Sequence, residues 1–186
     1  FKNAATQLLI AEQFLPVELS KEDANAAGPK VDYIFEPSKN EIVSAAREIV
    51  SSATTCTLIT IDEQGRPRAR AMDSFLPEED FTVWFGTNPK SRKVDQIKKD
   101  NRVTLYYLDH DSSGYVMIHG KAQIIKDQAE KEKHWKAEWE AFYPNKEDAF
   151  VLIKVAPEWM EVISNTRGIF GNKDTWEPTK INFEPN

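Results

Sequence analysis

The segment 87–93, which reads TNPKSRK, gathers the residues best suited to chemistry in this sequence. An apolar run that ends at Phe85 precedes it, and a helical pattern over residues 91–99 follows it, with Ser91 as the expected N-cap. A helix start offers unpaired backbone N–H groups, to which Thr and Ser hydroxyls add donors and Arg92 and Lys93 add full charges. These groups together predict a binding site for an anion such as phosphate.

Positive charge is concentrated in the same part of the chain. Residues 87–102 hold six lysines and arginines against two aspartates, a local balance of +4, whereas the whole chain of 186 residues has a formal net charge of -6. On composition alone, a charged helix that simply faces water explains this run equally well. The flanking threonine and serine hydroxyls favour the anion site.

Three arginines alternate in the preceding strand-like segment. Arg66, Arg68 and Arg70 are spaced by two, so they share one face of a strand, and Gly65 makes the turn before them tight. Three like charges side by side need a counterion, which a bound phosphate or a neighbouring carboxylate would supply, although solvated arginines on an exposed strand cost little. We assign the anion to Arg70 alone.

Other reactive residue types carry less information. The histidines His110, His119 and His134 are scattered without ligand spacing, so no metal site is predicted. Cys56 lies in an apolar run and is expected to be a small core residue. As the one cysteine, it indicates either a reducing compartment or a protein indifferent to redox conditions, and cytoplasm is the expected location. The acidic balance argues against nucleic acid as a partner, and no apolar run is long enough to cross a membrane.

The elements that must position these residues follow from periodicity. Ser38 and Glu41 form a capping-box pattern before a helix over residues 39–52. A second short helix is expected over 91–99, and an amphipathic one over 126–142 that packs Trp135, Trp139 and Phe142 on the sheet. Strands are expected over 55–61, 68–76, 81–85, 103–108, 115–125, 150–155 and 158–163.

This organisation predicts one folded domain with an appendage. Residues 1–37, with a short apolar helix pattern and then a polar stretch, are expected to be an N-terminal extension, and residues 38–186 to form the domain. Six or seven antiparallel strands with few helices predict a mainly β fold, a β-barrel with flanking helices. Closure into a barrel would protect strand edges that an open meander exposes.

The order of several motifs resembles a known family, the FMN-binding split barrels related to pyridoxamine 5'-phosphate oxidase, and especially its general stress protein 26 branch. The likeness covers residues 42–163. The segment TNPKSRK between a strand and a helix is fairly specific, whereas the other motifs are weak alone. Those are, in chain order, Gly65-Arg66-Pro67, Arg70-Ala71-Met72, Val83-Trp84-Phe85-Gly86, Asn101-Arg102-Val103 and the run from Tyr115 to Ala122.

The resemblance implies an FMN-dependent oxidoreductase that acts as a homodimer, with the flavin in a groove between two barrels and an electron donor such as NAD(P)H. The FMN phosphate would be held by Arg70, Arg92 and Lys93, with Ser91 nearby. The remaining implied cofactor residues would line the isoalloxazine ring and the ribityl chain; they are Ala71, Met72, Phe85, Gly86 and Thr87, with Tyr115 at the position of a glutamine that commonly contacts the flavin.

Departures from the family pattern concern the substrate. Phe75 stands where pyridoxamine phosphate oxidases carry a lysine, and Arg167 lacks the histidine that follows it in their substrate-binding Arg-x-His segment. Oxidation of pyridoxamine phosphate is therefore not expected, and the substrate is another small molecule. Two alternatives stay open: a non-catalytic flavin-binding or stress-response protein, and a split barrel that holds the deazaflavin F420 or haem instead of FMN.

Overall fold

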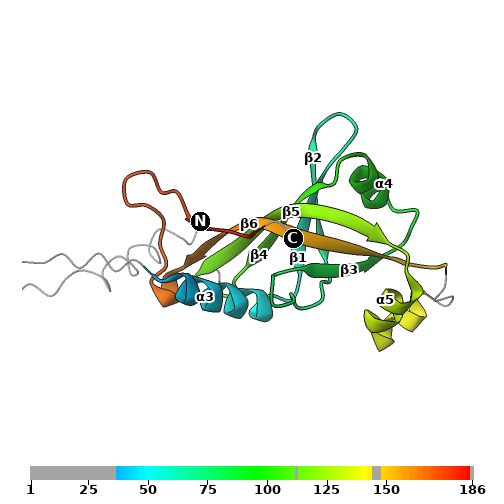
Figure 1. Cartoon of the computed structure of the whole chain (residues 1–186), viewed down its shortest axis with the longest axis horizontal. Coiled ribbons are helices and arrows are strands. Elements are labelled where there is room, and N and C mark those ends of the chain that lie inside the picture. Colours follow the sequence, from blue (N-terminus) through cyan, green and yellow to red (C-terminus); the bar gives the residue numbers. More distant parts are fainter. Residues whose placement is uncertain (1–36, 112, 144–147, 185–186) are drawn as a thin grey trace, which may run out of the picture. The chain divides into compact units, whose positions relative to one another are not determined.

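A computed structural model describes residues 37–111, 113–143 and 148–184, so the predicted N-terminal extension lies outside the described residues except for Pro37. The described part is an antiparallel sheet flanked by helices (Figure 1), which confirms the mainly β fold with six or seven strands. Its strands are β1 (Cys56–Ile61), β2 (Pro67–Met72), β3 (Val83–Thr87), β4 (Arg102–Leu108), β5 (Gly114–Ile125), β6 (Val151–Ser164) and β7 (Thr179–Asn182). Its helices are α3 (Lys39–Ser52), α4 (Arg92–Lys99), α5 (Gln128–Lys133) and the short 3-10 turns η1 (Ala137–Ala141) and η2 (Asn165–Arg167).

Helix α3 forms where the capping pattern predicts it. The Ser38 backbone N–H donates to Glu41 Oε2 at 2.8 Å, and the Glu41 N–H donates back to Ser38 Oγ at 3.3 Å, which satisfies two of the free donors at the helix start. One face of α3 packs into the main core beneath the sheet, as Figure 1 shows. The buried side chains of that face are Ile42, Ala45, Ala46, Ile49 and Val50.

The sheet runs in the order β2-β1-β4-β5-β6-β3, and β7 pairs with the opposite end of β6. The predicted strands 150–155 and 158–163 are wrong as two elements, because β6 is continuous through a bulge. His119 pairs with Trp159 and Gly120 with Pro157, so Glu158 is the extra residue. A side chain at Gly120 would lie 2.1 Å from the Ala156 carbonyl oxygen, so only glycine allows this approach. Strand β7 was not predicted.

Strands β2 and β3 are the two ends of this order, and the chain between them brings them together. The prediction that the second strand reaches residue 76 is wrong, because β2 ends at Met72 and the chain then leaves it. The Phe75 N–H instead donates to the Trp84 carbonyl of β3 at 2.9 Å. The segment that follows β2 at one end of the sheet therefore closes against β3 at the other end, as in a split barrel.

The predicted helix 126–142 is interrupted. It consists of α5 and η1, with His134 as the C-cap of α5, and together they cover the outer face of β3 and β6. Trp139 packs there in a second apolar cluster and Trp135 is half-buried against it, as predicted, whereas Phe142 is 77% exposed and that part of the prediction is wrong. A side chain at Gly86 would lie 2.3 Å from the Trp139 ring, so Gly86 lets the indole lie flat on β3.

Candidate functional site

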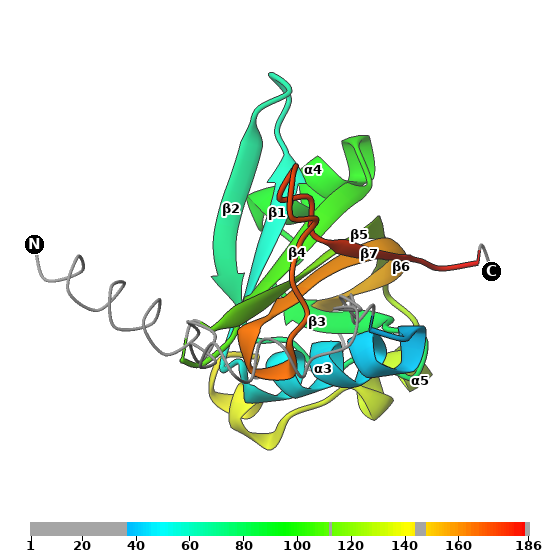
Figure 2. The same cartoon turned by 90° about the vertical axis from the view of Figure 1, so that its left-hand side faces the viewer.

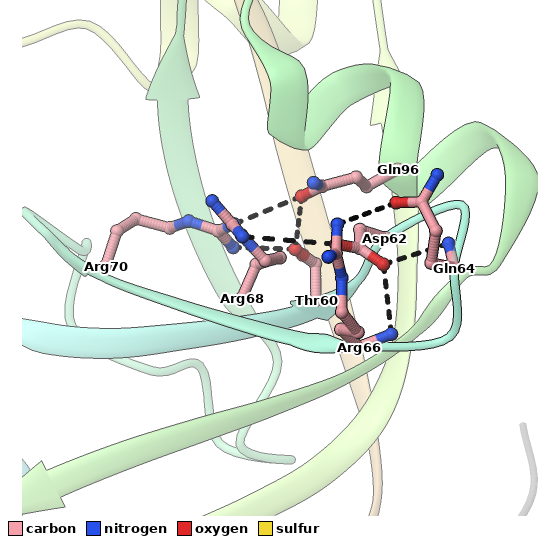
Figure 3. A network of polar contacts seen from close by, with 7 residues as sticks. All are labelled: Thr60, Asp62, Gln64, Arg66, Arg68, Arg70 and Gln96. Carbon is pink, nitrogen blue, oxygen red and sulfur yellow. Dashed lines mark hydrogen bonds and ion pairs between the residues drawn. The ribbon is translucent and has the colours of Figure 1, made fainter.

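Arg70 is the centre of a polar network that joins β1, β2 and α4 (Figure 3). Its Nη1 donates to Thr60 Oγ1 at 2.7 Å and to the Leu58 carbonyl at 3.2 Å, and its Nη2 donates to Gln96 Oε1 at 3.1 Å. Thr60 Oγ1 also donates to Gln96 Oε1 at 2.6 Å, so this one amide oxygen accepts hydrogen bonds from both Thr60 and Arg70. The guanidinium is thus held in place by neutral groups.

The start of α4 lies beside this network, as the sequence predicts. Figure 2 shows β1 and β2 running together along one side of the sheet with α4 next to β1. Lys93 Nζ donates to Thr87 Oγ1 at 2.9 Å, and Thr87 Oγ1 is 3.3 Å from Ser91 Oγ. Ser91 is the N-cap residue of α4, and its hydroxyl makes no capping bond, so Thr87 is its side-chain partner at the start of this helix.

The charges of this group, which we call the cation cluster (Arg70, Arg92 and Lys93), are not neutralised by any side chain that the structure describes. Within the part of the chain that the structure describes, no carboxylate lies within 4.0 Å of any of the three cationic groups. Burial and then the positive charge of Arg70 lower the pKa of Lys93. Burial, followed by the charges of Arg68 and Arg92, lowers the pKa of Arg70. The positive charges of the cluster therefore repel one another, which favours the binding of an anion among them.

The neighbouring arginines behave differently. Arg66 Nε pairs with Asp62 Oδ2 at 2.9 Å, and Arg68 lies 4.0 Å from the same oxygen (Figure 3). The neighbouring carboxylate that the sequence left open is thus Asp62, and it serves these two residues. Arg70 is the member of the alternating set whose counterion has to come from elsewhere.

The residues predicted to line the flavin ring lie in the same region of the fold, but their side chains point in different directions. Thr87 lies in the cation cluster's network, whereas the Phe85 side chain is fully buried in the main core and Met72 packs against that core. Ala71 is exposed on the other face of β2, and Gly86 faces Trp139. For Phe85 and Gly86, the groups open to a ligand are therefore backbone groups along β3, which is an end strand of the sheet.

Tyr115 is on the opposite face of the sheet from Arg70. Residues directly paired across strands share a face, and Arg70 pairs with Leu58, which pairs with Leu105, which pairs with Ile118. Tyr115 is three residues from Ile118, an odd number, so it points the other way. There it stacks on Tyr106 with ring centroids 5.2 Å apart. The fold of this chain therefore does not bring Tyr115 to the cation cluster.

Sequence reasoning missed Thr60 and Gln96. Thr60 is fully buried in β1, and a hydroxyl in the alternating inward-facing set with Cys56 and Leu58 was the available signal. Gln96 gave no such signal, because its role depends on how α4 packs against β1. Among the described residues, no three His, Cys, Asp or Glu side chains group as a metal site, and none of their helices is long and apolar enough to span a membrane.

The sequence model of the family described as "Pyridoxamine 5'-phosphate oxidase like" matches residues 41–171. General stress protein 26 of Bacillus subtilis is 25% identical over 125 residues, which cover 64% of this chain and 86% of that protein. A solved protein from Clostridium acetobutylicum, related to general stress protein 26, superposes with a TM-score of 0.64 at 23% identity over 78% of this chain and 96% of its own, which supports the fold.

A different likeness is confined to a short stretch. The ATP synthase gamma chain of Flavobacterium johnsoniae is 58% identical over 43 residues, which are 23% of this chain. The chain spans only 14% of the length of that relative. This match therefore concerns one segment and not the sheet as a whole.

Proposed function

Because the chain belongs to the pyridoxamine 5'-phosphate oxidase-like family, we propose that it binds FMN and acts as an oxidoreductase on a small molecule. The observation that carries the proposal is the cation cluster, whose three charges have no described carboxylate to neutralise them. A phosphate dianion would supply that charge and accept hydrogen bonds from Arg70, Lys93 and Ser91. The donor set thus fits the phosphate end of FMN.

We further propose that the working unit is a homodimer in which the partner completes the flavin site. Tyr115 cannot reach a ligand at its own protomer's cation cluster, because the two lie on opposite faces of the sheet. Around Tyr115 the outer face carries half-buried apolar and aromatic side chains, an arrangement that favours contact with another protein surface. A second copy would place its Tyr115 against the flavin. Members of that face include Ile59, Tyr106, Met117 and Trp159.

Bound FMN would supply hydride or electron transfer, and the chain's residues would bind and orient it. Arg70 is fixed by Thr60 and Gln96 before any ligand arrives, so little side-chain entropy is lost on binding. The backbone of β3 at Phe85 and Gly86 offers hydrogen-bonding groups along a sheet edge. The protein therefore fixes where the ring lies relative to the phosphate.

The structure gives physical reasons to propose a substrate other than pyridoxamine phosphate. Phe75 packs edge-on to Trp139, with ring centroids 5.6 Å apart, and offers no charge to a second phosphate. Arg167 is engaged in an ion pair with Glu48, to which its Nε donates at 2.8 Å. Neither position presents a free cation. The same observation favours the second candidate, a flavin-binding protein without turnover.

The test is the visible spectrum of the purified protein with and without added FMN. We expect a flavin spectrum, release of FMN on denaturation, one flavin per protomer and a dimer by sedimentation. A colourless protein that does not bind added FMN would contradict the proposal. A spectrum typical of haem or F420 would show that one of these, and not FMN, is the cofactor. If bound FMN is not reduced by NADH or NADPH without oxygen and no substrate is turned over, the non-catalytic candidate is favoured.

A further inference from the structure

A cavity of about 440 Å³ lies between β3, the segment that follows β2 and the C-terminal end of α5, outside the cation cluster. Its walls are aromatic. The rings of Trp84 and His134 are stacked with centroids 4.1 Å apart and planes 25° apart, and Phe75 meets His134 edge-on at 5.3 Å. Ser74, Leu76 and Lys136 complete most of the lining. An aromatic lining of this kind favours a ligand that has an aromatic ring of its own.

His134 is held so that one ring nitrogen is left over. The His134 side chain is only 8% exposed, and its Nδ1 lies 3.0 Å from the Glu130 backbone carbonyl. Glu130 Oε2 lies 3.4 Å from the same nitrogen. The carbonyl and the carboxylate both accept, so Nδ1 carries a proton, and in the neutral ring Nε2 presents a lone pair. Nε2 makes no hydrogen bond to any residue that the structure describes. Nε2 is therefore the ring nitrogen that a donor group of a ligand in the cavity can approach.

The two charged residues that line the cavity, Lys136 and Glu78, already have partners. Lys136 Nζ lies 2.6 Å from Asp73 Oδ1 and donates to the Ser74 carbonyl at 3.2 Å. The indole Nε1 of Trp84 donates to Glu78 Oε1 at 2.9 Å. These contacts leave no cation that demands an anionic ligand, in contrast to the cation cluster. The cavity is suited to an uncharged molecule.

We propose that this cavity binds a planar aromatic molecule that carries an O–H or N–H donor, which hydrogen-bonds to His134 Nε2. This deepens the proposed function, on which the link to FMN rests. Phe75 follows Arg70 by five residues and Trp84 precedes Thr87 by three, so at most about 18 Å and 11 Å of chain separate the cavity from the cation cluster. Trp84 and Thr87 point to opposite faces of β3, but β3 is an end strand, so a bound FMN would cross its edge to reach the cavity. A molecule there would lie within reach of the far end of FMN, and His134 positions it.

The experiment uses the full chain and two probes of nearly equal shape, 2-naphthol and naphthalene, titrated by calorimetry without FMN. One hydrogen bond to Nε2 should make 2-naphthol bind about 3- to 10-fold more tightly. His134→Phe keeps an aromatic ring against Trp84 but removes the acceptor, so that preference should disappear. His110→Phe, at an exposed loop position outside the cavity lining, should retain it. In the wild type, the NMR signals of the His134 ring nitrogens should shift when 2-naphthol is added but not when naphthalene is added. This measurement does not depend on whether the His134→Phe variant is stable.

Equal affinity for the two probes, or no binding of either, would overturn the proposal, as would an unmoved His134 signal. Repeating the titration with FMN separates the two claims. If FMN fails to bind while 2-naphthol keeps its preference, the proposed function fails and the cavity stands. If FMN competes with 2-naphthol, the cavity holds the flavin ring itself and the inference is wrong.

Discussion

Replacing Lys93 by methionine should change ligand affinity and stability in opposite directions. Lys93 is half-buried, donates to Thr87 and lies close enough to Arg70 for that charge to lower its pKa. Methionine keeps most of the apolar stem and removes the ammonium. If Lys93 served only the fold, this replacement would lower the stability of the protein. If Lys93 serves to bind an anion, the replacement would instead lower the affinity for the ligand.

The expected loss of affinity follows from one charge-assisted hydrogen bond to phosphate. Such a bond contributes about 1.5–3 kcal/mol, which is a weakening of FMN binding of roughly 10- to 150-fold. The sign of the stability change follows from the lowered pKa. Because the unfolded chain binds this proton more tightly than the folded protein, the charge destabilises the fold at every pH below the ordinary lysine pKa. At pH 7 the variant without FMN should therefore be as stable as the wild type or more stable.

Affinity is measured by quenching of flavin fluorescence and stability by thermal unfolding of the FMN-free protein. Lys98→Met is the matched control, because Lys98 is on the same helix, is exposed and lies 3.9 Å from Asp95. It should leave both quantities nearly unchanged. An unchanged FMN affinity in Lys93→Met, or a clear loss of stability without FMN, would refute the assignment of Lys93 to an anion site.

The remaining predictions concern packing, the buried thiol and the partner. Gly86→Ala should destabilise the protein by about 1–3 kcal/mol, seen as a lower Tm, because a methyl group would clash with Trp139; an unchanged Tm would show that the indole moves aside. Burial raises the pKa of Cys56 to about 12, so iodoacetamide at pH 8 should leave it unmodified until guanidinium unfolds the chain, and rapid alkylation of the native protein would count against this. Tyr115→Ala should weaken both dimerisation, measured by sedimentation, and FMN affinity; a variant that binds FMN as tightly as the wild type would exclude Tyr115 from the site.

Local signals were sufficient for the parts of the fold that depend on neighbouring residues. The Ser38 capping box marked the start of α3, and the helix start at Ser91 placed Thr87 and Lys93 together. Alternation placed Arg70 on a strand face, and the shortage of carboxylates near TNPKSRK was visible in the composition. These features needed no knowledge of distant contacts.

Features that depend on distant contacts could not be read from the sequence. Pro157 looked like the end of a strand, because its missing N–H breaks a ladder, but a bulge opposite Gly120 absorbs it and β6 continues. Likewise, the aromatic spacing over residues 126–142 looked like one helix. In the structure, His134 turns inward to stack on Trp84 and ends α5. Gln96 becomes part of the site only because α4 docks on β1.

The central claim is that the cation cluster holds the phosphate of FMN, and the most direct test compares FMN with riboflavin, which has the same ring and ribityl chain without the phosphate. Two or more charge-assisted bonds to the phosphate should make FMN bind at least about 100-fold more tightly than riboflavin in calorimetric titrations of the FMN-free protein. Equal affinity for the two flavins would contradict the account, because Arg70, Arg92 and Lys93 would then have no part in binding.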